Sequence, residues 1–239
     1  MRAESVLITG AAGSLGSALA ERCAERGWAT VLLDKDQRGL ERLFDRIEAE
    51  GWQEPILHPM DLAIAGPDEV QEMLDAIAEQ LGGLDALVHC AARFEALTPL
   101  EHVQPAEWLQ TVQVNLNAAW LLTSRSLPLL RQAEFGRLYF LLEDLARVGK
   151  ANWGPYGICK HALHAMIGQL AAETQGTRIQ VLGIDPGPMQ SPLRARAYVA
   201  ENPANPAPPT LAAEAIADVL SGKERASGLY LDLSPGAGQ

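Results

Sequence analysis

Seven short apolar runs alternate along the chain with longer segments whose apolar residues recur at helical spacing. Most of the short runs hold too few polar residues for either face to be wet, so they are expected to be strands buried in a mainly parallel sheet. The seven runs are SVLITG (5–10), ATVLLD (29–34), PILHPMD (55–61), LDALVHCAA (84–92), GRLYFLL (136–142), RIQVLGIDPG (178–187) and GLYLDL (228–233).

The segments between these runs carry helical patterns, which makes the order of elements regular. The expected helices span 14–26, 37–50, 67–81, 105–132, 155–174 and 210–221. Regular alternation of strands and helices predicts an α/β fold with a doubly wound, mainly parallel seven-stranded sheet and helices on both faces. In such a fold, ligands bind at the carboxyl ends of the strands.

Chain length and the placement of proline set the expected domain organisation. With 239 residues, of which 48% are hydrophobic, the chain can bury one full core, and we expect a single domain over 1–239. Seven of the 15 prolines lie between Pro186 and Pro209. Because long ordered loops in compact domains often bind ligands, we expect a substrate loop at about 186–209.

The glycine-rich stretch TGAAGSLG (9–16) links the first strand to the first helix. Glycines there permit a tight turn and a close approach of the backbone, so that a pyrophosphate can rest on the helix N-terminus. A glycine turn that serves packing alone is the alternative. The strand–turn–helix context favours a Rossmann-type dinucleotide site, and Asp34 at the end of the second strand strengthens this interpretation.

Asp34 also bears on the choice of cofactor. A carboxylate at this position can accept hydrogen bonds from both hydroxyls of an adenosine ribose and would repel a 2′-phosphate. Lys35 would oppose this repulsion, but the glycine loop itself contains no Arg or Lys. NAD(H) is therefore favoured over NADP(H). The alternative for Asp34 is a residue that only caps the end of its strand.

Composition argues against several other classes of partner and location. The net charge of −11 would repel the phosphates of a nucleic acid. No apolar stretch approaches the roughly 20 residues that cross a bilayer, and the N-terminus leads into a strand without a cleavage site, so we expect a cytoplasmic protein with no membrane contact. The three cysteines, Cys23, Cys90 and Cys159, form no CxxC pair and are expected to be buried thiols.

Several motifs together resemble the landmarks of the short-chain dehydrogenase/reductase superfamily, in its compact single-domain branch. Besides TGAAGSLG they are MDL (60–62), LVHCAA (87–92), VNLNAAWLLT (114–123), YGICK (156–160) and DPGPMQS (185–191). Their order along nearly the whole chain makes the resemblance more specific than any single motif. It implies an oxidoreductase that moves a hydride between a nicotinamide cofactor and an alcohol or carbonyl substrate.

The resemblance assigns the proton chemistry to three residues. Tyr156 matches the general acid/base, Lys160 lowers the pKa of that phenol from about 10 and binds the nicotinamide ribose, and Asn115 holds a water in the proton relay. The alternatives are a helix-start aromatic for Tyr156 and a helix cap for Asn115. The cofactor positions implied by the resemblance are Gly10, Ala12, Gly13, Ser14, Leu15, Gly16, Asp34, Asp61, Leu62, Cys90, Ala91, Ala92, Tyr156, Lys160, Pro186, Gly187, Met189 and Ser191.

One position departs from the family pattern. The resemblance implies a serine that donates a hydrogen bond to the substrate oxygen, about thirteen residues before the tyrosine, where this chain has Glu143. An ionised carboxylate only accepts hydrogen bonds, and it would raise the pKa of Tyr156. The loss of one such donor costs about a hundred- to a thousandfold in rate. Two alternatives stay open: Glu143 is protonated and donates, or it turns away to bind Arg147 or Lys150.

Two groups of charged or metal-ligating side chains have either a functional role or none. Four arginines lie on segments that border the substrate side, where they either grip an acidic substrate or are simply solvated. They are Arg93, Arg147, Arg194 and Arg196. We expect no metal site, because His161 and His164 have no third ligand near them in sequence.

The sequence therefore predicts an NAD(H)-dependent oxidoreductase for a small alcohol or carbonyl compound, with an activity that Glu143 would weaken. The alternative is a catalytically impaired dinucleotide-binding protein that acts as a sensor or interaction module. The resemblance also implies a homodimer or homotetramer built on the helices at 105–132 and 155–174. The identity of the substrate and the direction of the reaction are not specified by these motifs.

Overall fold

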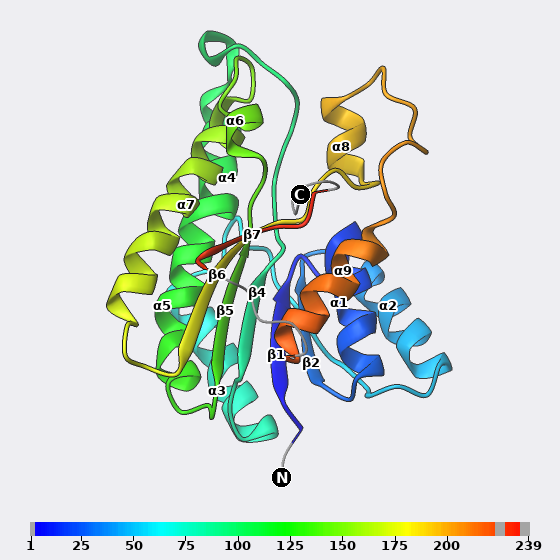
Figure 1. Ribbon diagram of the computed structural model, residues 1–239, viewed down its shortest axis with the longest axis vertical. Coiled ribbons are helices and arrows are strands. Elements are labelled where there is room, and N and C mark those ends of the chain that lie inside the picture. The colour runs from blue at the N-terminus through cyan, green and yellow to red at the C-terminus, as the bar shows by residue number, and fades with distance from the viewer. Residues whose placement is uncertain (1–2, 223–227, 235–239) are drawn as a thin grey trace.

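The computed structural model describes residues 3–222 and 228–234. Within them, seven strands form one sheet in the order β3-β2-β1-β4-β5-β6-β7, and all neighbouring strands are parallel (Figure 1). The predicted doubly wound α/β fold is confirmed, and the described sheet is parallel throughout. The strands are β1 (Ser5–Thr9), β2 (Ala29–Asp34), β3 (Ile56–Pro59), β4 (Ala86–His89), β5 (Gly136–Leu141), β6 (Ile179–Asp185) and β7 (Tyr230–Asp232).

Helices cover both faces of the sheet and bury their apolar sides against it. The helices on one face are α1 (Ser14–Glu25), α2 (Gln37–Ala49) and α9 (Pro209–Leu220). Those on the other face are α3 (Pro67–Leu81), α5 (Ala118–Leu130) and α7 (Gly154–Glu173), with α4 (Pro105–Val112) leading into α5. No helix in the described part of the chain combines the length and the apolar character needed to cross a bilayer.

The central strands are apolar at successive positions because both of their faces are covered. In β1, Val6 and Ile8 pack into the core on the α1 side, whereas Leu7 packs into the core on the α3 side. All three side chains are fully buried. Side chains of a strand alternate between the two faces, so a strand between two helical layers needs apolar residues throughout.

The helix expected at 105–132 is not one continuous α-helix. α4 ends at Val112, a π-helical turn spans Gln113–Asn117, and α5 begins at Ala118. Asn115 lies in this turn, and its Nδ2 donates to the carbonyl oxygen of Thr111 at 2.9 Å. A side chain that takes a backbone acceptor competes with the regular helical hydrogen bonds, and π-helical turns are frequent at functional sites.

Three short helices were not predicted: η1 (Leu100–His102), α6 (Leu145–Val148) and α8 (Pro192–Ala197). α8 lies inside the expected substrate loop, where the Ser191 hydroxyl accepts a hydrogen bond from the Arg194 amide at 3.1 Å and caps the helix. After α8 the chain returns, and the Gln190 amide donates to the carbonyl oxygen of Ala207 at 2.9 Å. The segment 186–209 is thus a long excursion that carries a helix of its own.

Candidate active site

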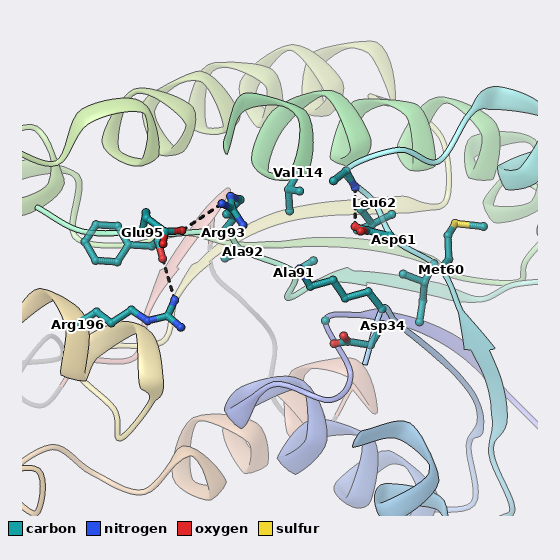
Figure 2. Close-up of a pocket in the computed structure, with 15 residues that line it drawn as sticks. Asp34, Met60, Asp61, Leu62, Ala91, Ala92, Arg93, Glu95, Val114 and Arg196 are labelled. Atoms are coloured by element: carbon teal, nitrogen blue, oxygen red, sulfur yellow. Dashed lines mark hydrogen bonds and ion pairs between the residues drawn. The ribbon is translucent and has the colours of Figure 1, made fainter. Parts of the chain in front are cut away.

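The carboxyl ends of the strands surround a cavity of about 360 Å³. Figure 2 shows Asp34, Asp61 and Leu62 toward one end of this cavity and Arg93, Glu95 and Arg196 toward the other. The cofactor positions expected from the sequence that line it are Gly10, Asp34, Asp61, Leu62, Ala91 and Ala92. Residues from the loops after β1, β2, β3 and β4 therefore meet in one elongated cavity.

The glycine loop at the start of α1 is tight enough to require glycine. Gly10 has a φ of +66°, and a Cβ atom there would lie 2.7 Å from the backbone of Ala91. A Cβ atom on Gly16 would lie 2.2 Å from the carbonyl oxygen of Gly10. Both positions therefore exclude any side chain.

The N-terminus of α1 is well suited to a phosphate group. Gly13 caps the helix without a side-chain hydrogen bond, and the first turn contains no acidic residue. The first N–H groups and the positive end of the helix dipole are thus not neutralised by the helix's own side chains. Ser14, Leu15 and Gly16 form this first turn, and Ala12 precedes it. These residues fit the pyrophosphate of a dinucleotide.

Asp34 serves the shape of the loop as well as lining the cavity. Its Oδ2 accepts a hydrogen bond from the Ala12 amide at 3.0 Å, and its Oδ1 accepts one from the Asp36 amide at 3.0 Å. Each carboxylate oxygen can accept a second hydrogen bond, so the two ribose hydroxyls of a nucleotide could still be bound. The capping role and the ribose role expected from the sequence are therefore compatible.

Asn115 joins the cavity wall at Arg93 to the π-helical turn between α4 and α5. Its Oδ1 accepts a hydrogen bond from the Arg93 amide at 2.9 Å, and its Nδ2 donates to the Arg93 carbonyl oxygen at 2.8 Å. The side chain is 2% exposed. It fixes the chain just after Cys90, Ala91 and Ala92, which is a different role from the helix cap considered above.

Tyr156 and Lys160 lie four residues apart on α7, and both are buried. Lys160 Nζ donates to the carbonyl oxygen of Leu141 at 2.7 Å and lies 5.4 Å from the centroid of the Tyr156 ring. Burial lowers the pKa of Lys160, and the Glu143 carboxylate opposes that shift. The lysine and the phenol are therefore held side by side, as the family resemblance implies.

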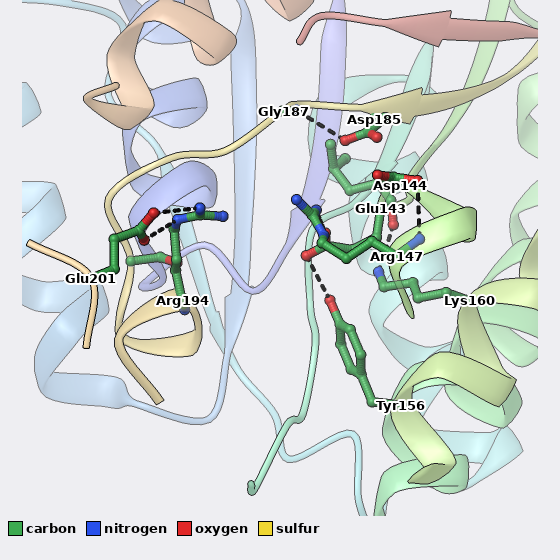
Figure 3. A network of polar contacts seen from close by, with 11 residues as sticks. Glu143, Asp144, Arg147, Tyr156, Lys160, Asp185, Gly187, Arg194 and Glu201 are labelled. Carbon is green, nitrogen blue, oxygen red and sulfur yellow. Dashed lines mark hydrogen bonds and ion pairs between the residues drawn. The ribbon is translucent and has the colours of Figure 1, made fainter. Parts of the chain in front are cut away.

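Glu143, which the family resemblance places at the serine position, contacts Tyr156 directly. The Tyr156 hydroxyl donates to Glu143 Oε1 at 3.2 Å, while Arg147 Nη2 forms an ion pair with Glu143 Oε2 (Figure 3). Burial raises the pKa of Tyr156 well above its usual value, the Glu143 carboxylate raises it further, and Arg147 opposes the rise. Glu143 thus binds Arg147, as one alternative held, but it does not turn away from the tyrosine.

The loop after β6 brings Gly187, Met189 and Ser191, three of the expected cofactor positions, to a second cavity that Glu143 also lines. Gly187 has a φ of +72°, and its amide donates to Asp185 Oδ1 at 2.9 Å, which turns the chain after Pro186. This second cavity has a volume of about 30 Å³. The residues lining it are Glu143, Arg147, Trp153, Gly187, Met189, Ser191, Leu193, Arg194 and Tyr198.

An aromatic cluster around Tyr156 was missed by the sequence analysis. The ring centroids of Phe94 and Trp153 lie 5.3 and 5.9 Å from that of Tyr156, and Tyr198 lies 6.2 Å from Trp153. The motif NWGPY places Trp153 three residues before Tyr156, which is a local signal for this contact. Phe94 and Tyr198 come from distant loops and left no such signal.

The four arginines near the site are mostly paired within the chain. Arg93, Arg147 and Arg194 form ion pairs with Glu95, Glu143 and Glu201, respectively. Arg196 instead donates from Nη1 to the carbonyl oxygen of Phe94 at 3.1 Å. Three of the four positive charges are thus balanced locally, which weakens the case for an acidic substrate.

Comparisons with known proteins identify the family of this chain. The short chain dehydrogenase family matches residues 4–202. The uncharacterized oxidoreductase YciK of Escherichia coli K12 is 32% identical over 198 residues, which cover 83% of this chain and 78% of that protein.

Solved structures of similar chains share the whole fold. A short chain dehydrogenase from Pseudomonas syringae superposes with a TM-score of 0.92 at 31% identity, over 98% of this chain and 95% of that one. A short chain dehydrogenase from Escherichia coli CFT073, solved in complex with NADPH, superposes with a TM-score of 0.91 at 30% identity, over 98% of both chains. This chain therefore belongs to the short chain dehydrogenase family.

Proposed function

We propose that the protein is an NAD(H)-dependent oxidoreductase that acts on an alcohol or carbonyl group of a small molecule. The observation that carries this proposal is the position of Tyr156 and Lys160, side by side on α7. Phe94 lines the cavity together with Asp34, and its ring contacts that of Tyr156 at a centroid distance of 5.3 Å. A cofactor in that cavity would have its adenosine at Asp34 and its nicotinamide near Tyr156. The named oxidoreductases and dehydrogenases among its relatives support this function and lend no support to a sensor or interaction module.

The proposed chemistry divides between the cofactor and the protein. The nicotinamide, when bound, supplies or accepts the hydride. Tyr156 Oη gives its proton to a carbonyl oxygen during reduction and takes one from an alcohol during oxidation. Lys160 places a positive charge beside the phenol, and Asn115 holds the chain at Arg93 between the cavity and α4.

The preference for NAD(H) rests on Asp34. Its carboxylate lines the cavity at the end of β2, where a 2′-phosphate would meet a negative charge. Lys35 also lines the cavity and is the one opposing charge that the sequence places next to Asp34. A similar chain from Escherichia coli was solved with NADPH, so the cofactor preference needs a direct test on this protein.

Calorimetric titration of the purified protein with NADH and with NADPH tests this proposal. We expect NADH to bind at least about tenfold more tightly than NADPH, and Asp34→Ala to reduce this difference in affinity. Asp36→Ala removes a neighbouring carboxylate that caps α2, and it should leave the difference in affinity between NADH and NADPH unchanged. Equal or tighter binding of NADPH would contradict the NAD(H) preference, and binding of neither nucleotide would contradict the proposed function itself.

A further inference from the structure

Arg147 lies beside the proton-transfer group of the proposed active site. Asp144 caps the short helix α6, and its Oδ1 accepts a hydrogen bond from the Arg147 amide at 3.2 Å. Because Glu143 lies four residues before Arg147, the two side chains meet over this turn and form their ion pair. Figure 3 shows the Glu143 carboxylate between the guanidinium and the Tyr156 hydroxyl, in contact with both.

The guanidinium has donors to spare. It carries five N–H groups, and Glu143 is the one side chain for which a hydrogen bond to it is found within the described residues. Its Nε is buried and has no partner in that part of the structure. Buried polar groups normally have a hydrogen-bond partner, so an orphan donor beside a reactive side chain marks a place for an acceptor atom.

The space next to Arg147 has the size and lining for one polar group of a substrate. The cavity of about 30 Å³ there has room for roughly two waters. Glu143 and Arg147 line it together with the aromatic rings of Trp153 and Tyr198 and the hydroxyl-bearing Ser191. A carbonyl oxygen that enters this space would approach the guanidinium beside Glu143, whose Oε1 accepts a hydrogen bond from the Tyr156 hydroxyl at 3.2 Å.

The Glu143–Arg147 pair also resolves the problem of charge at the serine position. A lone carboxylate there would repel the electron density that grows on the substrate oxygen during reduction. With the guanidinium bound to it, the pair carries no net charge, as a serine carries none. The pair further offers N–H donors, which a carboxylate lacks.

We propose that Arg147 donates the hydrogen bond to the substrate oxygen that a serine donates elsewhere in the family, with Glu143 holding the guanidinium beside Tyr156. This inference rests on the proposed function. During reduction the Tyr156 proton passes to the carbonyl oxygen, and an Arg147 N–H stabilises the negative charge that develops there before the proton arrives. The neutral pair suits an uncharged ketone, aldehyde or alcohol better than a substrate with a carboxylate at this position.

The test compares the wild type with Arg147→Ala and Glu143→Ala/Arg147→Ala in NADH-dependent reduction of a panel of carbonyl compounds. On the compound that the wild type reduces fastest, Arg147→Ala should lower kcat about a hundredfold, while the affinity for NADH stays within about twofold. Added guanidinium chloride should restore part of the lost rate with saturation. The double variant should stay slow, because removal of the Glu143 carboxylate does not replace the hydrogen-bond donor that was lost with Arg147.

Several results would overturn this role. A wild-type kcat in Arg147→Ala would overturn it, and so would full recovery in the double variant, which would mean that Arg147 only neutralises Glu143. If Arg147→Ala fails to bind NADH, Arg147→Met takes its place in the test. Methionine keeps most of the side-chain volume but has no donor, so the same loss in kcat is expected. Arg46→Ala, which breaks a surface ion pair of 2.8 Å with Glu21, is the control and should keep the wild-type rate.

The failure of this inference and the failure of the proposed function look different. If the wild type binds NADH but reduces no carbonyl compound, the proposed oxidoreductase function fails, and the role of Arg147 falls with it. If the wild type is active and Arg147→Ala is equally active, only the role of Arg147 fails.

Discussion

The hydroxyl of Tyr156 has two competing partners. It donates to Glu143 Oε1 at 3.2 Å, whereas the proposed reaction requires it to exchange a proton with the substrate. Burial and the carboxylate both raise the pKa of this phenol, and Arg147 opposes the rise. We therefore expect Glu143 to set the pH at which Tyr156 exchanges its proton.

Replacing Glu143 by serine should move the pH dependence of alcohol oxidation. Oxidation needs the deprotonated phenol, so its rate rises with pH up to the pKa of Tyr156. Glu143→Ser removes a negative charge that raises this pKa, so the profile should shift to lower pH. Near neutrality the rate should increase about tenfold for each unit by which the pKa falls.

The matched control for this change is the neighbouring carboxylate. Asp144→Ser removes a negative charge one residue away but keeps a residue type that can cap α6. Its pH profile should stay close to that of the wild type. Superposable profiles of Glu143→Ser and the wild type would show that the carboxylate does not control Tyr156.

At the scale of secondary structure elements, local signals predicted most of the fold. Residues close in sequence, such as the pair Tyr156 and Lys160, are enough to predict the strands, the glycine loop and α7. They do not predict the break between α4 and α5, because Asn115 is held by the backbone of Arg93, 22 residues away in sequence. A contact of that kind cannot be read from helical periodicity.

The short helices α6 and α8 were not predicted, for a different reason. α8 has a recognisable start, with Ser191 as its cap and Pro192 in its first turn, but its six residues are too few for a periodic pattern. The same limit hid α6, which presents Arg147 to Glu143. The sequence analysis offered Arg147 as a partner for Glu143. It did not predict that the same carboxylate also accepts a hydrogen bond from Tyr156.

At the scale of the whole molecule, one layer of helices leaves large apolar side chains exposed. Leu109 is 67% exposed and Trp120 is 58% exposed, and both belong to the layer of α4, α5 and α7 along one side of Figure 1. Exposed apolar patches often mark contacts between proteins. Together with the family resemblance, this layer supports the expected twofold contact between copies of the chain.

Leu109→Glu should therefore weaken self-association, because it places a charge in the expected contact. We expect light scattering to give a dimer or tetramer for the wild type at micromolar concentration and a smaller species for this variant. Ile64→Glu, at an exposed apolar residue in the loop after β3, should keep the wild-type mass. A wild type that is monomeric at this concentration would contradict the predicted assembly.

The most direct test of the oxidoreductase proposal follows the consumption of NADH with a panel of ketones and aldehydes, for the wild type and for Tyr156→Phe. Removal of one hydroxyl takes away the proposed proton donor and leaves the aromatic cluster in place. We expect the wild type to oxidise NADH with at least one carbonyl compound, and Tyr156→Phe to bind NADH normally but to react at least about a hundredfold more slowly. Equal rates for the two proteins, or no carbonyl-dependent oxidation by a wild type that binds NADH, would contradict this proposal.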